Sequence, residues 1–242
     1  MSSSSIDEVR LLAELVAIPS PSGSEEDVAR LAEEAARRAG LDVRRDELGV
    51  VVEVAGHAAG PTLALVSHLD TVPPGEGWSR DPFEPAVEDG RLYGRGSGDA
   101  KASVAAMLAA AADVAAQGGP PRGRLLVVLG LSEETPDTTM PRLVPTLGAV
   151  DAAVVGEPTN LDLAIAQRGV LWLDLVARGT QIHAGRAGGE GLVNAIATLA
   201  RDLLALGDVG AGRPHPVLGD PTITPTVLEA GLSRNVTPPV AR

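Results

Sequence analysis

Three short apolar runs, each about as long as a β-strand, constrain the fold of this chain more than any other feature. The longest covers residues 125–131 and contains no polar side chain. Such a run suits a central strand that is covered on both faces. Residues 62–66 and 152–155 form shorter runs of the same kind. Helical patterns surround them, so we expect an α/β fold, an open sheet with helices on both faces.

Each apolar run is followed by side chains that can bind a metal ion or move a proton. His68 and Asp70 follow the first run, Glu133 and Glu134 the second, and Glu157 the third. In open α/β sheets, ligands bind at the carboxyl ends of the strands. We therefore expect these side chains to gather at one edge of the sheet.

A further carboxylate, Asp99, lies between a glycine-rich turn and a helical pattern that begins near Ala100. Gly94, Gly96 and Gly98 allow the backbone before it to turn tightly. The chain contains no cysteine, so any zinc ion must be bound by His, Asp and Glu. One imidazole and several carboxylates on such loops are typical of a site for zinc or a similar borderline ion.

Two metal ions bridged by a carboxylate would give each of these residues a role. The expected bridge is Asp99, and the expected terminal ligands are His68, Glu134 and Glu157. Neighbouring glutamates at a strand end point in different directions, so Glu133 would be the base that takes a proton from water. Asp70 would accept a hydrogen bond from His68 and orient its ring.

The remaining elements follow from apolar spacing and from Gly and Pro breaks. We expect further helices at 6–18, 24–39, 100–116 and 192–206, and further strands at 41–45, 50–54, 170–177 and 222–229. The pattern changes near residue 169, which predicts a domain at 1–168 and a second at 169–242.

The acidic composition argues against two classes of binding partner. The formal net charge of −12 disfavours nucleic acids and anionic membranes. The first residues lack a basic segment followed by an apolar one, and no apolar span reaches membrane length. We therefore expect a cytoplasmic protein.

Five motifs occur together in one order: S-H-L-D-T-V-P, W-S-R-D-P-F, G-R-L-Y-G-R-G-S-G-D-A-K, S-E-E-T and G-E-P-T. From about residue 8 to its end, the chain resembles the M20 family of co-catalytic zinc hydrolases. That family includes acetylornithine deacetylase, succinyl-diaminopimelate desuccinylase, glutamate carboxypeptidase and aminoacylase. The resemblance implies a zinc-peptidase-like catalytic domain and a partial α+β, ferredoxin-like lid and dimerisation domain.

The resemblance also implies roles for single residues. His68 and Glu157 would bind one zinc, Glu134 the other, and Asp99 would bridge the two, with cobalt as a possible substitute metal. Asp70 would orient His68, and Glu133 would be the general acid and base. His183, in H-A-G-R-A, would reach the active site of a partner subunit and help to bind the oxyanion.

The implied activity is hydrolysis of an N-acyl amino acid by a water molecule that the metal activates. Glu157 and the N-A-I at 194–196 resemble the deacetylase branch. The alternatives are a carboxypeptidase of the same family, acting on short peptides, and a truncated homologue that only binds metal or dimerises. The implied assembly is a homodimer formed through the lid.

Simpler interpretations exist for each residue taken singly. A histidine after a strand is often only hydrogen-bonded, and paired glutamates suit a helix N-terminus. Glu157 before Pro158 is common in turns, and His183 lies in a glycine-rich loop. His57 and His215, in Gly/Pro loops, suggest no function. Only the combination of His68 with the carboxylates favours a metal site.

The chain also departs from the family pattern. Its D-A-K-A has Ala102 where the family usually has glycine. In the family, the chain continues past a segment like N-V-T-P (235–238) and later supplies a histidine to the second zinc. This chain ends at Arg242. We therefore expect the site with Asp99 and Glu134 to lack a ligand.

Calorimetric titration with Zn²⁺ tests this expectation. One tighter ion should bind through His68, Asp99 and Glu157, and the second should bind weakly or not at all because only two ligands remain for it. Two equally tight sites would contradict the assignment.

Overall fold

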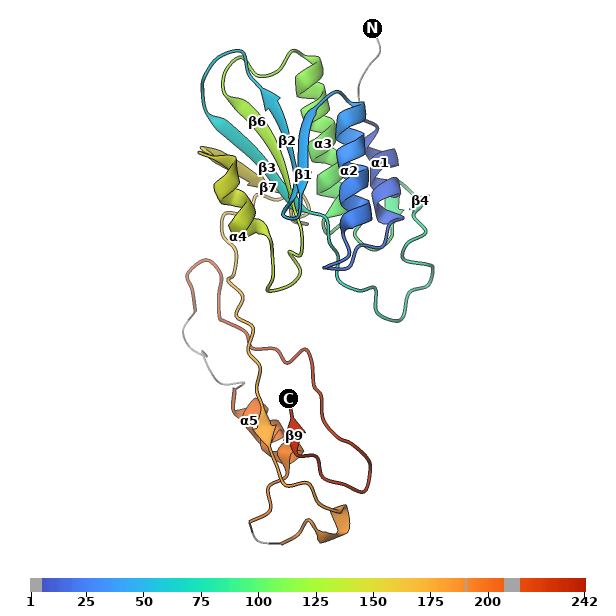
Figure 1. Cartoon of the computed structure of the whole chain (residues 1–242), viewed down its shortest axis with the longest axis vertical. Helices are drawn as coiled ribbons and strands as arrows, with labels where there is room; N and C mark the ends of the chain where they lie inside the picture. Colours follow the sequence, from blue (N-terminus) through green and yellow to red (C-terminus); the bar gives the residue numbers. More distant parts are fainter. Residues whose placement is uncertain (1–5, 190, 207–213) are drawn as a thin grey trace. The chain divides into compact units, whose positions relative to one another are not determined.

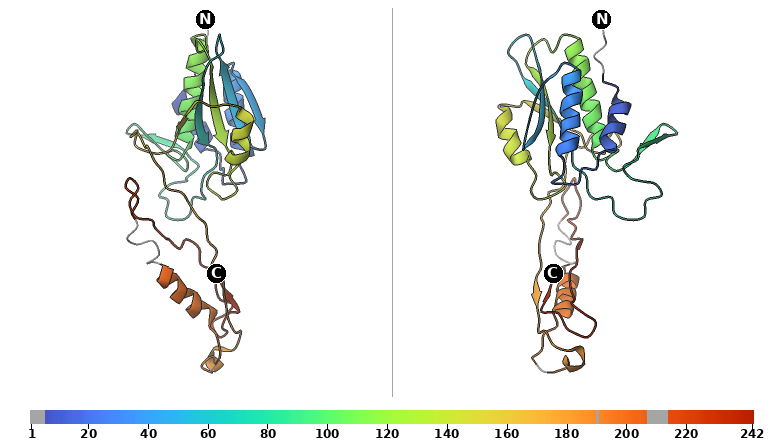
Figure 2. Two further views of the ribbon diagram at one scale, coloured as in Figure 1. Left: turned by 90° about the vertical axis from the view of Figure 1, so that its left-hand side faces the viewer. Right: turned by 45° about the vertical axis from the view of Figure 1, so that its right-hand side comes forward.

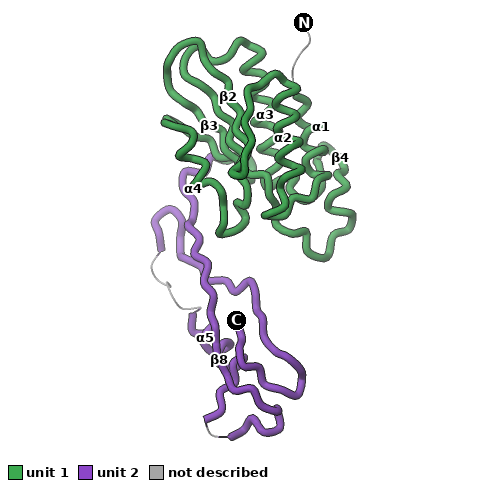
Figure 3. Tube along the Cα trace, viewed as in Figure 1, with its two compact units in different colours: residues 1–162 green, residues 163–242 purple. Residues whose placement is uncertain are grey.

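The computed structural model describes residues 6–189, 191–206 and 214–242. The chain divides into two compact units, Met1–Asp162 and Leu163–Arg242 (Figure 3). This division lies a few residues before the boundary predicted at 168/169. The two domains expected from the sequence stay a prediction. Each unit has its own apolar core.

A five-stranded mixed sheet forms the centre of the first unit, with the order β1-β2-β6-β3-β7. β3 is parallel to both β6 and β7, whereas β2 is antiparallel to β1 and to β6. The carboxyl ends of β3, β6 and β7 therefore meet at one edge. The strands are β1 (Asp42–Asp46), β2 (Gly49–Ala55), β3 (Thr62–His68), β6 (Arg124–Gly130) and β7 (Ala152–Val155).

The central strand β6 is buried on both faces, as its continuous apolar sequence predicts. Leu125, Val127 and Leu129 belong to one core cluster, and Leu126 and Val128 belong to the other. Three helices cover the first face: α1 (Glu8–Val16), α2 (Glu26–Arg38) and α3 (Lys101–Ala116). The short helices α4 (Met140–Leu143) and η1 (Val144–Leu147) cover the second (Figures 1 and 2).

The helices form where the sequence provides capping residues and small side chains. The carboxylate of Asp7 accepts a hydrogen bond from the Arg10 amide at 2.9 Å and so caps α1. α3 contains many alanines, and Ala105, Ala111 and Ala112 are buried against the sheet side of the unit. None of the helices in the described residues is long and apolar enough to span a membrane. The predicted α/β architecture with helices on both faces is confirmed.

The predicted burial of residues 152–155 is wrong. All four residues of β7 are exposed, including Val154 and Val155 at 52% and 58%. β7 pairs with β3 on one side only and forms an edge of the sheet in the described residues. Apolar sequence alone cannot distinguish an edge strand from a central one, because strand order depends on pairing between distant segments.

The second unit is smaller and contains one long helix, α5 (Ala195–Leu206), capped by the side chain of Asn194. The other elements described in this unit are the two-residue strands β8 (Ala177–Arg178) and β9 (Val240–Ala241), which pair antiparallel, and the short η2 (Ala184–Arg186). Ala177, Ala195, Leu199 and Ala241 form its core.

The predicted strands at 170–177 and 222–229 are wrong, apart from the paired Ala177. Most residues of both segments are exposed. Among the described residues their backbone pairing is confined to one end of each: Ala177 pairs with Ala241, and Glu229 exchanges two backbone hydrogen bonds with Arg242. A strand is defined by such a partner, which an apolar, β-branched sequence does not supply by itself. Part of the loop at 207–221 lies outside the described residues.

Because the sheet is buried on both faces at β6, shortening a side chain there should destabilise the protein more than shortening an exposed side chain. Leu129→Ala in β6 should lower the free energy of unfolding by about 2–5 kcal/mol, because Leu129 is fully buried. Leu63→Ala in β3, where the side chain is 39% exposed, should cost about 1 kcal/mol or less. Chemical denaturation measures both, and equal losses would contradict the burial described here.

Candidate metal centre

Polar side chains gather at the edge where β3, β6 and β7 end. His68 is the last residue of β3 and lies opposite Gly130, the last residue of β6. Beyond the strands, the Leu69 amide donates to the Gly130 carbonyl at 3.1 Å, and the Gly156 amide donates to the Val66 carbonyl at 2.8 Å. The parallel pairing therefore brings the three loops together, as the sequence predicts.

Three of the predicted ligands converge within this edge. One ligand atom from each of His68, Asp99 and Glu134 lies within 4.8 Å of the other two. The Nε2 atom of His68 is 3.1 Å from Oδ1 of Asp99. His68 is buried, whereas Asp99 is half exposed, so the group opens towards solvent on one side. The assignment of these residues as metal ligands stays a prediction.

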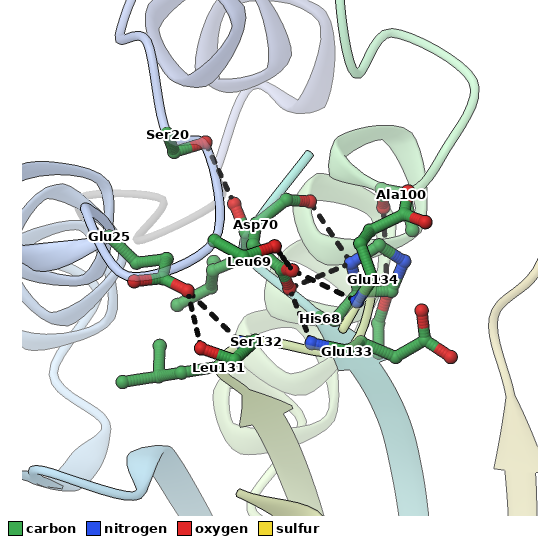
Figure 4. Close-up of polar contacts among 12 residues, drawn as sticks. Ser20, Glu25, His68, Leu69, Asp70, Ala100, Leu131, Ser132, Glu133 and Glu134 are labelled. Carbon is green, nitrogen blue, oxygen red and sulfur yellow. Dashed lines mark hydrogen bonds and ion pairs between the residues drawn. The ribbon is translucent and has the colours of Figure 1, made fainter. Parts of the chain in front are cut away.

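Asp70 is completely buried and connects three segments through its carboxylate. Its Oδ2 accepts hydrogen bonds from the Ser22 hydroxyl at 2.6 Å and from the Glu134 amide at 3.0 Å. Its Oδ1 accepts from the Glu133 amide at 2.9 Å and lies 3.3 Å from Nδ1 of His68 (Figure 4). The Nδ1 atom also lies 3.0 Å from the Asp70 carbonyl. This arrangement orients the imidazole ring and leaves Nε2 towards Asp99.

The pairing of His68 with Asp70 shifts both pKa values. Burial alone lowers the pKa of His68, but the hydrogen bond and negative charge of Asp70 outweigh it, and the pKa is raised to about 9. The charges of Glu157 and Glu133 act in the same direction. Burial alone raises the pKa of Asp70, but the hydrogen bonds that it accepts lower it to about 2. The pair is therefore an imidazolium and a carboxylate at neutral pH unless a cation displaces a proton from His68.

Glu133 and Glu134 are directed apart, as expected for neighbours at a strand end (Figure 4). Glu134 belongs to the converging group, whereas Glu133 is exposed. Glu157 is partly buried and lies outside the three-residue group, although its charge reaches His68. The structure thus places Glu134, rather than Glu157, with His68 and Asp99.

Negative charge is concentrated at this edge. Burial raises the pKa of Glu134, and the carboxylate of Asp99 adds to the rise. Burial also raises the pKa of Glu157, where Asp99, Glu133 and Glu134 contribute in the same direction. Carboxylates that repel one another in this way are stabilised by a divalent cation.

In the glycine-rich turn before Asp99, two glycines adopt the positive φ values that their residue type allows. Gly94 and Gly96 have φ values of +155° and +86°. A Cβ atom on Gly96 would lie 2.9 Å from Thr71 Cγ2 and 3.0 Å from Lys101 Cδ. The buried Lys101 passes beneath this turn and donates to the carbonyls of Leu15 and Ile18 at 2.9 and 2.8 Å. Glycine at position 96 therefore makes room for a lysine that connects α3 with α1.

His183 lies in the second unit and is exposed. Its Nδ1 accepts a hydrogen bond from the Gly185 amide at 3.2 Å, which is turn chemistry within its own loop. Its predicted role in binding an oxyanion stays a prediction.

Sequence reasoning missed three polar residues around the site: the buried Glu25 and Lys101, and the partly buried Ser22. Glu25 fitted a helix start, and Lys101 fitted the first turn of α3. For Ser22 and Glu25, the available signal is the S-P-S-G-S-E segment at 20–25, which is rich in hydrogen-bonding side chains for a loop between two helices.

Residues 64–234 match the sequence profile of peptidase family M20/M25/M40. The matched span covers well over half of the chain and includes all seven predicted site residues. The chain belongs to this family. The resemblance inferred from the motifs is therefore confirmed.

Two curated relatives illustrate the range of activities among the proteins that this chain resembles. A succinyl-diaminopimelate desuccinylase of Xanthomonas campestris pv. campestris (strain B100) is 35% identical over 191 residues, covering 73% of this chain and 51% of the relative. A probable carboxypeptidase of Aspergillus terreus is 36% identical over 204 residues, covering 80% of this chain and 46% of the relative. This chain spans about half the length of the curated relatives it matches.

Solved structures show the same fold. The M20 family metallo-carboxypeptidase Sso-CP2 from Sulfolobus solfataricus matches with a TM-score of 0.69 at 17% identity, covering 97% of this chain and 69% of that chain. Human carnosine dipeptidase 1 matches with a TM-score of 0.70 at 20% identity, covering 97% and 68%. At these identities the likeness supports the M20 fold and no finer assignment.

The His68–Asp70 pair predicts a pH dependence that NMR can measure. In the metal-free protein, one histidine should titrate with a pKa of about 9, and Asp70→Asn should lower that pKa because it removes the neighbouring negative charge. Zn²⁺ must displace this proton, so its affinity should rise with pH up to about 9.

His68→Gln assigns the titrating NMR signal to His68, since the signal with a pKa of about 9 should disappear in this variant. A histidine at position 68 that titrates near its ordinary value in the wild-type protein would contradict the pairing.

Proposed function

We propose that this chain is the metal-binding catalytic part of an M20 hydrolase that removes the acyl group from an N-acyl amino acid. The observation that supports it best is the convergence of His68, Asp99 and Glu134 beside an exposed Glu133, which forms no ion pair with another described residue. Family membership supports the same reaction class.

The residues fit a divalent cation. They offer one imidazole nitrogen and two carboxylates, a donor set that zinc accepts, and Asp70 supports the imidazole from the opposite side. A cation bound there would polarise the amide carbonyl and lower the pKa of a water molecule. We propose zinc, with cobalt as a functional substitute and Glu157 as a further ligand to one ion.

The chain's own residues would then carry the proton. Glu133 is next to the ligand Glu134 but points away from it, so its carboxylate is available as a base (Figure 4). It would take a proton from the attacking water and deliver it to the nitrogen of the departing amino acid. Asp70 would keep the His68 ring fixed while charge develops at the edge.

The names of the relatives support two candidate substrate classes. The desuccinylase relative supports an N-succinyl amino acid, and the resemblance to the deacetylase branch supports an N-acetyl amino acid such as N-acetylornithine. A second candidate is a carboxypeptidase that acts on short peptides, which the Aspergillus terreus relative favours.

We also propose a homodimer formed through the second unit, in which His183 would serve the partner's active site. Supporting this, the second unit exposes several large apolar side chains, among them Leu171, Trp172 and Leu173 at 80%, 59% and 63%. Surfaces of this kind are typical of protein interfaces. A cytoplasmic location stays an expectation from the sequence.

Hydrolysis assays with Zn²⁺ or Co²⁺ test the proposal. The wild-type protein should release the free amino acid from N-succinyl-diaminopimelate or N-acetylornithine. Glu133→Gln should lower kcat by about 10²–10⁴-fold, because it removes the base, while Zn²⁺ affinity remains unchanged.

Glu134→Gln is the matched control, because it should lose Zn²⁺ affinity and activity together. Cleavage of peptides without action on N-acyl amino acids would favour the carboxypeptidase. Tight Zn²⁺ binding without turnover of any of these substrates would favour a protein that only binds metal.

A further inference from the structure

Glu25 is a buried acidic residue that its local structure does not explain. It stands at the N-cap position of α2, yet its side chain makes no capping hydrogen bond. It is 5% exposed, whereas the adjacent Glu26 side chain is 74% exposed and pairs with Arg45. Burying a carboxylate is costly unless hydrogen bonds compensate for the lost water.

The compensating donors lie in a segment distant in sequence, the turn that follows β6. Oε1 of Glu25 accepts hydrogen bonds from the Ser132 amide at 3.0 Å and from the Ser132 hydroxyl at 3.1 Å (Figure 4). Ser132 has a φ of +55°, a left-handed conformation that residues with a side chain rarely adopt. The carboxylate therefore stabilises an unfavourable turn at the exit of the central strand.

This turn carries the two glutamates of the site. The amides of Ser132, Glu133 and Glu134 follow one another, and each donates to a buried carboxylate: the first to Glu25 and the next two to Asp70. Two carboxylates from different segments thus fix three consecutive peptide groups. The directions of the Glu133 and Glu134 side chains depend on these groups.

The α1–α2 loop (residues 17–25) makes further contacts with the same site. The Ser20 carbonyl accepts from the Thr71 amide at 2.9 Å, and the Ser20 hydroxyl donates to the Leu69 carbonyl at 2.9 Å. Ser22 donates to Asp70. The Ile18 carbonyl accepts from Lys101, the first residue of α3. The loop therefore contacts the segments that carry His68, Asp99 and Glu134.

We propose that Glu25 is a positioning residue: by binding Ser132, it fixes the turn that directs Glu134 into the ligand group and Glu133 away from it. Its consequence for metal affinity rests on the proposed function. The effect of Glu25 on the turn is independent of the proposed function, because the hydrogen bonds between Glu25 and Ser132 need no metal.

Hydrogen exchange in the metal-free protein tests the effect on the turn. Glu25→Ala should increase exchange of the amides at 132–134, because one acceptor is lost and the turn loosens. Glu25→Gln keeps an acceptor oxygen and should restore most of the protection. Glu26→Ala is the matched control, since it removes a neighbouring glutamate without touching the turn. Wild-type exchange in Glu25→Ala would overturn the proposal.

Zn²⁺ affinity and the visible spectrum of bound Co²⁺ test the effect on the site. Glu25→Ala should weaken Zn²⁺ binding by about 10-fold or more and alter the Co²⁺ spectrum, while Glu25→Gln and Glu26→Ala retain wild-type values. Unchanged affinity and spectrum in Glu25→Ala would overturn the proposal.

Two further outcomes separate the proposals. If Glu25→Ala does not fold, Ser132→Ala can replace it, because this variant removes only the hydrogen bond from the Ser132 hydroxyl. It should increase amide exchange at 132–134 by a smaller amount. Wild-type exchange rates in Ser132→Ala would then overturn the inference. If the wild-type protein binds no Zn²⁺, the proposed function fails, and the exchange rates alone decide the role of Glu25.

Discussion

The buried carboxylate of Asp70 is the interaction on which the rest of the site depends. It accepts hydrogen bonds from the α1–α2 loop, from the turn after β6 and from the imidazole at the end of β3. A buried charge costs several kcal/mol unless such partners satisfy it. Because its partners come from the α1–α2 loop, the end of β3 and the turn after β6, the carboxylate is stable only when these three segments are assembled. The same contacts that make its burial tolerable orient His68 and the turn that carries Glu134.

The sheet makes this assembly possible. Neighbouring strands lie about 4.8 Å apart, so side chains that follow adjacent strands can reach towards one cation. Since β3 is parallel to both β6 and β7, the residues after His68, Gly130 and Val155 leave the sheet side by side. The apolar clusters on both faces of β6 hold the central strand between its neighbours. The apolar core and the polar site are therefore parts of one arrangement.

The proposed metal site suits a class of reaction rather than one substrate, and the names of the relatives differ in substrate. A desuccinylase and a probable carboxypeptidase match this chain at similar identity. Activation of water at an acyl carbon requires the same ligands and base in either reaction. Under the proposed function, discrimination between an acyl amino acid and a peptide would therefore depend on contacts away from His68, Asp99 and Glu134. The proposed reaction class is accordingly more general than any one substrate.

Local sequence predicted the five strands of the central sheet and the convergence of three candidate ligands at its edge. A continuous apolar run such as 125–131 has few alternatives to a buried strand, and parallel strands place the residues that follow them at one edge. His68, Asp99 and Glu134 could therefore be associated from sequence. The resemblance of the motifs then identified the family.

Tertiary structure decided what depends on distant partners. Ser132 and Glu25 are 107 residues apart, and Lys101 and Ile18 are 83 apart, so no local pattern reveals that they bind each other. The exposure of β7 and the lack of strands at 170–177 and 222–229 depend in the same way on which segments lie alongside. The sequence by itself determined which residues are candidates to bind a metal ion, because side-chain type and apolar spacing are local properties. Only the fold decided which groups position them, because hydrogen bonds and strand pairing are made in space between segments far apart in the chain.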